Sequence, residues 1–459
     1  MVRPVEMAKQ TWADALAGIP DQRQWIAEQL GLARQTPGLS MDGRELLRVA
    51  QPRFMDPGAW AADQAVVAAV TSALDAAAEW VLQPSSSRHH YLGPWADDER
   101  ILDLFSLPTG YTQRVAFGRF DGVRTHDGLR ILEFNGGLPG GTASAAASAL
   151  LMSTWPSFAA VDEVLDIEVP DVRGALVDAL TAVWHSFGGT GVPRSAFVVP
   201  REFQPHVAGQ MQVMLATMQS RGIDATTCDP GELVRKGGRV YGPDGIIDVA
   251  VRVFFTSMLP ALGSRIDTMV EAVRAGELCM VTSFRAGLLG HKSLFAVITD
   301  PDIDLAMPAD SLDVARAHLP WTRIATDGPT MAPGGESIDL RRYALDHADK
   351  LVLKPADGTG GAGVMLGWEH DAAAWREALE GAWASPETWI LQERLPLAIE
   401  EFPLLDEGFP VRHFQTDHNP LVFNDQIGGY FVRLSETGGI TNMSTGDGTV
   451  APVYAIATR

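Results

Sequence analysis

The chain has 459 residues, which is enough for two or three domains with a sizeable core. Its composition is globular, with 46% hydrophobic and 20% charged residues, and its formal net charge is −21 at pH 7. This acidic balance argues against nucleic acid and acidic membrane surfaces as partners, because both require a basic footprint on the protein. A basic pocket for a phosphate ligand remains compatible with it.

The sequence predicts a cytoplasmic protein without a membrane span. The first ten residues lack the apolar core of a secretory signal, and we expect no run of about 20 apolar residues. The nearest approach is residues 143–161, whose serines and proline favour a packed helix. Cys228 and Cys279 are too few for a disulfide framework or a metal cluster, and are expected to be buried thiols in a reducing compartment.

Residues 1–110 are expected to form a mostly helical region. Apolar residues recur at helical spacing over 7–16, 22–32 and 59–82. A stretch rich in proline and serine then ends the last of these helices.

A β-hairpin is predicted within residues 113–144, where an Asp-Gly pair separates two alternating apolar runs. Side chains two residues apart share a face of a strand, so Arg119 and Asp121 lie together on the first arm, and Glu133 and Asn135 on the second. Two carboxylates and an amide oxygen are hard ligands, which suit Mg²⁺ together with substrate phosphates. The alternative is an ordinary solvated hairpin, since any half-exposed strand shows polar alternation.

Residues 166–265 alternate between helical and strand patterns. Strands that alternate with helices favour a parallel sheet covered on both faces, so we expect a small open α/β domain here. The expected helices are 174–187 and 205–221, and the expected strands are 195–199, 222–226 and 247–255.

Residues 266–350 are expected to form helices and loops, with Lys292 at the start of a strand over 293–299. A polar loop is expected at 326–337 and a helix at 339–349. The chain then becomes β-rich. The expected strands are 351–354, 364–368, 389–393, 411–414, 421–424 and 429–434, with a helix near 371–384.

A glycine-rich loop at 358–363 joins two of these strands. It matches G-x-G-x-x-G, but a strand follows it where the dinucleotide fingerprint requires a helix, and it has neither a Walker Gly-Lys-Ser/Thr nor protein-kinase motifs after it. Loop amides and the ammonium of Lys354 could together bind a triphosphate, with Lys292 as a second cation. The alternative is a purely structural turn. The glycines concerned are Gly358, Gly360, Gly361 and Gly363.

With these motifs the chain resembles the circularly permuted ATP-grasp ligases, and in particular the synthetase module of the glutathionylspermidine synthase family. The metal-binding hairpin lies more than two hundred residues before the lysine and glycine loop, an order typical of the permuted group. The likeness rests on the hairpin, on Lys292 and Lys354 with the loop, and on 428–433, 440–442 and 450–452. Residues 442–448 depart from the synthase pattern and no amidase half is evident, so glutathione and spermidine are not assumed as substrates.

The resemblance implies an ATP-dependent carboxylate–amine ligase that uses ATP and Mg²⁺ and passes through an acyl phosphate. Its partners would be a small-molecule acid and an amine, such as an amino acid, a short peptide or a polyamine. The implied roles are Asp121, Glu133 and Asn135 for metal, Lys292, Lys354 and the loop glycines for phosphates, Gln392 and Glu393 for adenine, Arg119 for the transferring phosphoryl group, and Arg433 for a substrate carboxylate.

The implied fold is α/β (α+β), a circularly permuted ATP-grasp with a small preceding α/β domain and a helical N-terminal region. A small-molecule kinase on the same scaffold and a nucleotide-binding protein without turnover remain alternatives, and the strand after the glycine loop disfavours a dehydrogenase. The expected regions are 1–110, 111–165 with the hairpin, 166–265 for substrate, and 266–459 for nucleotide.

Overall fold

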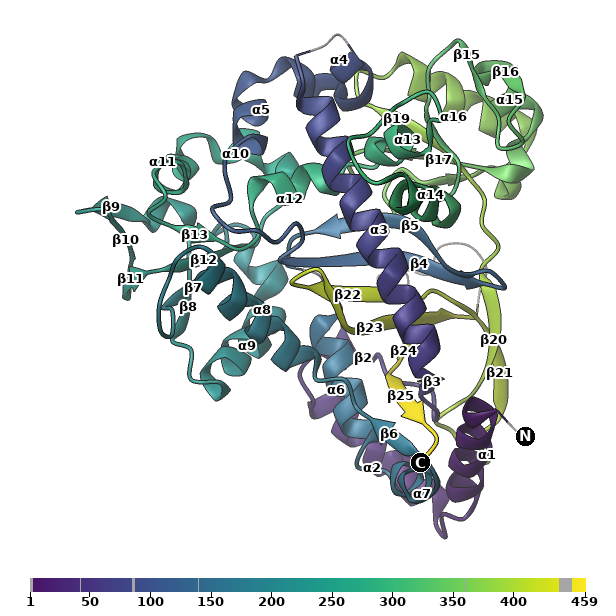
Figure 1. Ribbon diagram of the computed structural model, residues 1–459. Coiled ribbons are helices and arrows are strands. Elements are labelled where there is room, and N and C mark those ends of the chain that lie inside the picture. The colour runs from purple at the N-terminus through teal and green to yellow at the C-terminus, as the bar shows by residue number, and fades with distance from the viewer. Residues whose placement is uncertain (1–2, 42, 85–86, 139, 359, 437–447) are drawn as a thin grey trace.

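A seven-stranded antiparallel sheet lies at the centre of the molecule (Figure 1). Two strands from the first third of the chain pair there with strands from its last quarter. The computed structural model describes residues 3–41, 43–84, 87–138, 140–358, 360–436 and 448–459. In sheet order the strands are β20 (Ala398–Pro403), β21 (Val411–Thr416), β23 (Gln426–Ser435), β22 (Asn419–Phe423), β4 (Phe117–Thr125) and β5 (Gly128–Gly136), with β24 (Thr449–Ala451) beside β23.

The predicted hairpin is confirmed as β4 and β5. Arg119 lies opposite Asn135, and Asp121 lies opposite Glu133. A bulge follows at Gly122, whose amide donates to a side chain of β22. The four polar residues share one face, as the alternation of the two arms predicted. The bulge sets their pairing, because the register of the turn alone would place Asp121 opposite Leu132.

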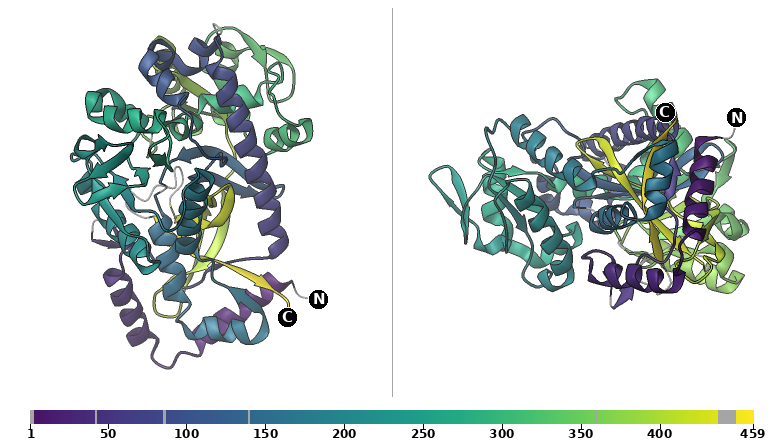
Figure 2. Two further views of the ribbon diagram at one scale, coloured as in Figure 1. Left: turned by 60° about the vertical axis from the view of Figure 1, so that its left-hand side comes forward. Right: turned by 90° about the horizontal axis from the view of Figure 1, so that it is seen from below.

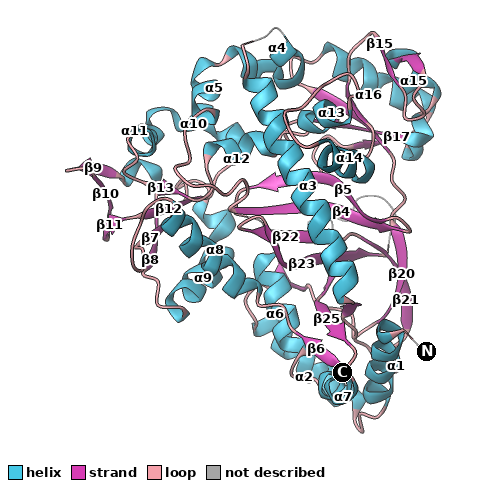
Figure 3. Cartoon of the chain, viewed as in Figure 1, coloured by secondary structure: helices cyan, strands magenta, loops and turns pink. Residues whose placement is uncertain are grey.

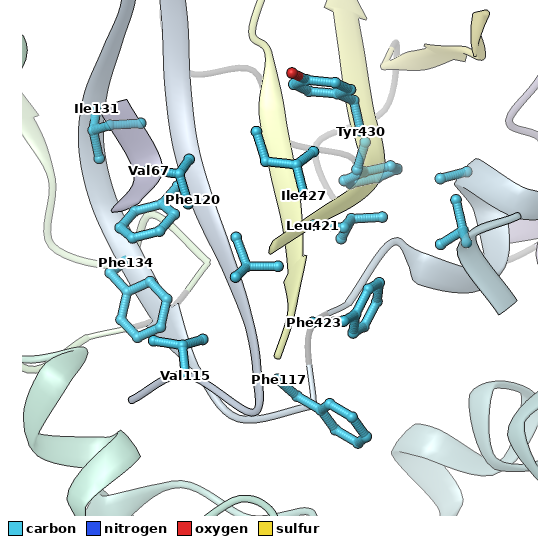
Figure 4. Close-up of a cluster of buried hydrophobic side chains, with 14 of the residues drawn as sticks. Val67, Val115, Phe117, Phe120, Ile131, Phe134, Leu421, Phe423, Ile427 and Tyr430 are labelled. Carbon is cyan, nitrogen blue, oxygen red and sulfur yellow. The ribbon is translucent and has the colours of Figure 1, made fainter. Parts of the chain in front are cut away.

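The apolar face of this sheet forms the main core. Figure 4 shows side chains of β4, β5, β22 and β23 gathered with Val67 of the helix that covers them. Phe120 and Phe134 face each other across the hairpin with ring centroids 4.7 Å apart, and neither is more than 4% exposed. Burying one phenylalanine side chain stabilises the fold by about 2 kcal/mol. Because alternate residues of a strand face opposite sides, burial of these rings turns the charged residues of the hairpin to the other side.

The helix that covers this core is α3 (Pro57–Leu82), which crosses the sheet diagonally in Figure 1. It begins where Asp56 accepts a hydrogen bond from the amide of Ala59, with a proline at its first position. It packs against β5, α13 (Ser293–Thr299) and α14 (Ala309–His318).

The apolar length of α3 differs from the sequence expectation. Within the described residues it is one helix that, by length and composition alone, could cross a membrane, although half of its most apolar window is buried inside the fold. The expected helix at 143–161 is instead two helices, α6 (Thr142–Met152) and α7 (Pro156–Val164). Pro156 cannot continue a helix but suits the first turn of a new one.

The small parallel sheet expected before residue 265 is present, and Figure 3 shows helices on both sides of it. The strand expected at 222–226 begins three residues later, at Ala225. The strand expected at 247–255 covers only Val249–Arg252, which pair with the four residues of β7. The sheet order is β13 (Cys279–Met280), β12 (Val249–Arg252), β7 (Ser195–Val198) and β8 (Ala225–Cys228). The helices of this region are α8 (Val172–Ser186), α9 (Gln204–Ser220), α10 (Leu259–Leu262) and α11 (Asp267–Arg274). A separate ribbon projects from it in Figure 1 and consists of β9 (Val234–Lys236), β10 (Arg239–Gly242) and β11 (Gly245–Ile247).

A second antiparallel sheet carries the glycine loop. Its order is β14 (Thr322–Ile324), β19 (Trp389–Glu393), β17 (Leu351–Pro355) and β18 (Met365–Leu366), and it packs with α15 (Leu340–Asp346) and α16 (Ala372–Ala384).

Several elements of this half differ from their predicted forms. Residues 293–299 form α13, not a strand after Lys292, since a short apolar run does not distinguish a buried helix from a buried strand. The strand expected at 364–368 ends at Leu366, and Gly367 starts a helical turn where a Cβ would lie 2.0 Å from the carbonyl oxygen of Ala348. The expected loop 326–337 contains a short ribbon, β15 (Pro329–Met331) and β16 (Ser337–Asp339).

The two ends of the chain meet at one side of the molecule, as the views in Figures 1 and 2 agree. Strand β25 (Val453–Ala457) pairs with β3 (Arg53–Met55) on one side and β6 (Asp166–Glu168) on the other. The first hundred residues are mostly helical, as predicted, with α1 (Pro4–Ala17), α2 (Gln22–Gln35), α4 (Ser87–Leu92), α5 (Glu99–Phe105) and two short strands, β1 (Ser40–Met41) and β2 (Arg44–Glu45). Residues 440–442, part of the C-terminal resemblance, lie outside the described residues.

Candidate functional site

One cavity lies between the polar face of the β4–β5 hairpin and the sheet that carries the glycine loop. The space between these walls, with the solvent at its open mouth included, is about 1180 Å³. It brings together all of the site residues expected from the sequence except Gly363. These are Arg119, Asp121, Glu133, Asn135, Lys292, Lys354, Gly358, Gly360, Gly361, Gln392, Glu393 and Arg433.

Gly363 instead shapes the end of the loop. Its φ of +76° favours glycine, and a Cβ there would lie 3.3 Å from the ring of Pro355. We therefore assign Gly363 to the turn and not to the wall of the cavity.

Two buried lysines face one carboxylate at the charged end of the cavity. The Nζ atoms of Lys292 and Lys354 lie 3.5 Å and 4.0 Å from Oε2 of Glu133. Lys292 Nζ also donates to the carbonyl oxygen of Gly358 at 2.8 Å, and its backbone amide donates to Ala356. Asp357 also interacts with Lys292, and Asp121 with Lys354, so carboxylates surround both ammonium groups. Two ammonium groups at one wall of a cavity suit the binding of a polyphosphate.

Burial lowers the pKa of Lys354 to about 8. Glu133 opposes the shift, whereas the nearby charge of Lys292 adds to it. Lys354 is 6% exposed, and its ammonium donates to the carbonyl oxygen of Leu132 at 3.3 Å. Its charge is therefore held in a desolvated position at the cavity wall.

Asp121 sits at the centre of a hydrogen-bond network beside these lysines. Oδ1 accepts from Arg119 Nε at 2.6 Å and from Asn135 Nδ2 at 3.0 Å, and Oδ2 accepts from Arg119 Nη2 at 3.1 Å and Arg433 Nη2 at 2.9 Å. Burial would raise the pKa of Asp121, but the two guanidinium groups outweigh it and hold the pKa below its ordinary value. Asp121 is therefore ionised, and each of its oxygens accepts two hydrogen bonds.

Arg433 joins Asp121 to a carboxylate that the sequence reasoning missed. Its Nε donates to Asp417 Oδ2 at 2.6 Å, and its backbone amide donates to Oδ1 of the same residue. Asn419 Nδ2 also donates to Asp417 at 2.8 Å. The available signal was the spacing Asp417-x-Asn419, which repeats the acid-x-amide spacing of the hairpin.

The other end of the cavity is mostly apolar. Gln392 lies between the two ends, because its amide donates to Thr322 Oγ1 at 3.2 Å and, at 3.4 Å, to the carbonyl oxygen of Leu132 that also accepts from Lys354. Glu393 lies where β19 leaves the sheet. Nothing in the local sequence marks the apolar wall, because its residues come from four separate segments. They are Leu132, Val352, Val364, Leu366, Trp368, Leu395 and Leu397.

The donor types of the hairpin fit Mg²⁺, with one condition. Within the described residues no group of three or more His, Cys, Asp or Glu side chains could hold a metal, so the expected set depends on the amide of Asn135. Glu133 contacts the lysines only at 3.5 Å or more, which leaves its oxygens accessible to a cation. Asp121 would have to release one of its present donors, because its oxygens already accept four hydrogen bonds.

Helix α12 (Phe284–Leu289) positions Lys292 against the end of the hairpin. A Cβ at Gly136 would lie 1.9 Å from the carbonyl oxygen of Ala286, so only glycine permits this contact. On its far side Arg285 forms an ion pair with Asp75 of α3 at 2.8 Å. The helix is thus held between β5 and α3, directly before the lysine.

No protein-family model matches the chain. Two proteins of Frankia are similar to parts of the chain. The protein named glutamate–cysteine ligase 2-2 of Frankia casuarinae is 41% identical over 175 residues. The protein named glutamate–cysteine ligase 2-3 of Frankia alni is 26% identical over 130 residues. These matches cover 36% and 28% of this chain, and the chain spans only 19% and 13% of the length of those relatives.

A solved structure aligns with nearly the whole chain. It is a glutathione synthetase-like effector from Globodera pallida, with a TM-score of 0.58, 12% sequence identity, and coverage of 95% of this chain and 99% of that one. The two chains share a fold. The mixed α/β class expected from the sequence is therefore confirmed, and the fold is that of a glutathione synthetase-like protein.

Proposed function

We propose that the chain is an ATP-dependent carboxylate–amine ligase of the ATP-grasp type. The observation that carries the proposal is a single cavity that combines two buried lysines and a glutamate with an apolar wall that includes Leu366, Trp368 and Leu395. Such a cavity suits a nucleotide, with phosphates at one end and the base at the other. The fold shared with a glutathione synthetase-like protein and the ligase names of the two relatives support the same reaction class.

The substrates follow only as classes. Because the chain spans at most a fifth of the relatives, the activity in their names does not transfer to it directly. We propose a small-molecule acid, such as an amino acid or short peptide, and an amine, which an amino acid, peptide or polyamine would supply. We also propose the cytoplasm as the compartment, which the buried free thiols of Cys228 and Cys279 support.

The order of the motifs supports a circular permutation. Strands β4 and β5 precede the glycine loop in the chain, yet β4 pairs with β22, which follows the loop. The pairing of β25 with β3 brings the chain ends to one side, an arrangement in which a permutation costs little.

In the proposed reaction the substrate carboxylate oxygen attacks the γ-phosphorus of ATP, and the bond from that phosphorus to the β–γ bridging oxygen breaks, which releases ADP. The amine nitrogen then attacks the acyl carbon, phosphate leaves with the bonding pair, and the nitrogen loses a proton to give the amide. Lys292 and Lys354 neutralise the phosphates, and Arg119 stabilises charge on the transferring phosphoryl group.

Glu133, Asp121 and Asn135 would hold Mg²⁺, which when bound supplies positive charge to the phosphate oxygens. The present hydrogen bonds of Asp121 keep Arg119 directed toward the cavity. Arg433 stays the candidate for a substrate carboxylate, which would take the place of Asp121 or Asp417 as its partner.

The test is an ADP-release screen with purified protein, Mg²⁺, ATP and mixtures of amino acids, short peptides and polyamines, read by mass spectrometry. A ligase releases ADP only when an acid and an amine are both present, and it forms a product of their combined mass less one water. The variant Lys354→Met serves as the control and should lose activity. A stable phosphorylated product without any amine would indicate a kinase, and ATP binding without ADP release would indicate a nucleotide-binding protein.

A further inference from the structure

We infer that the nucleotide base stacks on the indole of Trp368, which Arg394 holds from behind. This inference rests on the proposed function and adds to it a residue that sets base recognition. It differs from the sequence expectation, in which only Gln392 and Glu393 were placed near the base.

Trp368 lies in the helical turn that follows β18 and lines the apolar end of the cavity. Its side chain is half-buried. The indole is therefore part of a wall that a ligand in the cavity can reach.

Arg394 covers one face of this ring. Its guanidinium carbon lies 4.1 Å from the ring centroid, a close cation–π contact. Arg394 is held in turn by backbone carbonyls, since its amide donates to Lys350 at 2.8 Å and its Nη1 donates to Asp349 at 3.3 Å. Arg394 does not line the cavity, so we place the ring face that it covers on the side turned away from the cavity.

The position of the ring relative to Lys354 fits a nucleotide. Val352 and Lys354 share a face of β17, about 7 Å apart along the strand. Val352 pairs with Leu366, two residues before Trp368, and all four residues line the same cavity. A ligand whose phosphates lie at Lys354 would thus reach the indole with its base. A flat aromatic face tolerates any base, because every base has a π face.

The chain offers a matched control. Arg341 lies 4.3 Å above the ring of Trp383, which is also half-buried but does not line the cavity. Trp383→Leu removes the same chemical group from an equivalent cation–π pair and leaves the cavity wall unchanged.

Titration calorimetry in the presence of Mg²⁺ measures affinity for two probes, ATP and inorganic triphosphate. The proteins compared are the wild type, Trp368→Leu, Trp368→Phe and Trp383→Leu. Trp368→Leu should weaken ATP binding about ten- to a hundredfold and leave triphosphate binding within a factor of two. Trp368→Phe should keep most of the ATP affinity, and Trp383→Leu should keep all of it.

Tryptophan fluorescence emission gives a second readout, which does not depend on whether the variants differ from the wild type in folding stability. Saturating ATP should change the emission of the wild type and of Trp383→Phe, and should leave that of Trp368→Phe unchanged. Unaltered ATP affinity in Trp368→Leu, or an equal loss for both probes, would overturn the inference while the proposed function stands. If the wild type binds neither probe, the proposed function fails and the inference fails with it.

Discussion

At the scale of single residues, the site depends on a charge balance around Glu133. This carboxylate lies within 4.0 Å of both buried lysines, so it keeps their charges compatible with burial. Asp121, by contrast, is neutralised by Arg119 and Arg433. Of the two hairpin carboxylates, Glu133 is therefore the better placed to bind a metal ion. When a nucleotide binds, its phosphates can pair with the lysines, and Glu133 can then contact the metal ion in their place.

Replacing Glu133 by glutamine should lower turnover about a thousandfold, because about 4 kcal/mol of metal-held stabilisation would be lost from the transition state. The rate of ADP release in the presence of acid and amine measures the effect. Glu401→Gln, on an exposed strand of the central sheet, is the matched control and should turn over normally. A loss of less than threefold in Glu133→Gln would contradict a metal-holding role.

Lys354 predicts opposite pH trends for stability and for ATP binding. Its pKa is about 8 when folded against 10.5 ordinarily, so between these values the unfolded state binds more protons and the free energy of unfolding rises with pH. ATP binding needs the charged form, so the affinity for ATP should fall as pH rises through about 8. Calorimetric titration from pH 7 to 10 measures the affinity, and Lys354→Arg, which keeps its charge, should flatten the profile. Identical profiles for the two proteins would refute the assignment.

At the scale of elements, α12 joins the small parallel sheet to the charged end of the cavity. Arg252, at the end of β12, is 3% exposed and donates to the carbonyl oxygens of Thr282 at 3.0 Å and Ser283 at 3.1 Å, and also to Phe254. Ser283 is the N-cap of α12, and Lys292 follows the helix. Burial lowers the pKa of Arg252 to about 10, yet among the described residues no carboxylate pairs with it. Its guanidinium hydrogen bonds hold the segment at the start of this helix in place.

Arg252→Met should destabilise the protein by about 3 kcal/mol, because it leaves buried carbonyl groups without donors. It should also weaken ATP binding, since the position of Lys292 depends on α12. Urea unfolding and calorimetry measure the two effects. Arg274→Met removes an exposed arginine that pairs with Asp103, and it should change both quantities little. Equal behaviour of the two variants would mean that Arg252 does not position the helix.

At the scale of the whole molecule, the cavity lies between two sheets that come from different parts of the chain. The central sheet supplies Glu133 and Arg433, and the second sheet supplies Lys354 and the glycine loop. A ligand that contacts both sheets should therefore stabilise the folded state as a unit.

Saturating Mg²⁺ and ATP should raise the melting temperature by several degrees. Binding at a hundred times the dissociation constant adds about 2.7 kcal/mol to the free energy of unfolding. Differential scanning calorimetry measures the shift, and a chelator added with ATP should remove much of it if the metal takes part. AMP, which lacks the outer phosphates, is the control and should shift the melting temperature less. No shift at millimolar ATP would exclude a nucleotide site in this cavity.

The hairpin and the glycine loop show how far sequence reasoning reached. The Asp-Gly turn and the alternation of its arms predicted a hairpin with its four polar residues on one face, because turn type and strand period act over a few residues. They did not predict the bulge that brings Asp121 opposite Glu133. The same reasoning misassigned 293–299 as a strand, since a short buried apolar run has no distinguishing period. It predicted α3 as a helix over 59–82, but it did not recognise that the helix is long and apolar enough to cross a membrane.

By itself the sequence determined the hairpin, the shared face of its four polar residues, and the lysine with its glycine loop, because these depend on interactions between near neighbours. Only the tertiary structure decided that Arg433 bridges Asp121 and Asp417 and that Trp368 lines the apolar wall of the cavity. Arg433 and Asp121 are separated by 312 positions, and they meet because β22 and β23 pair into the sheet begun by β4 and β5. No local pattern encodes which distant strand lies beside another, since that choice depends on burying both apolar faces at once.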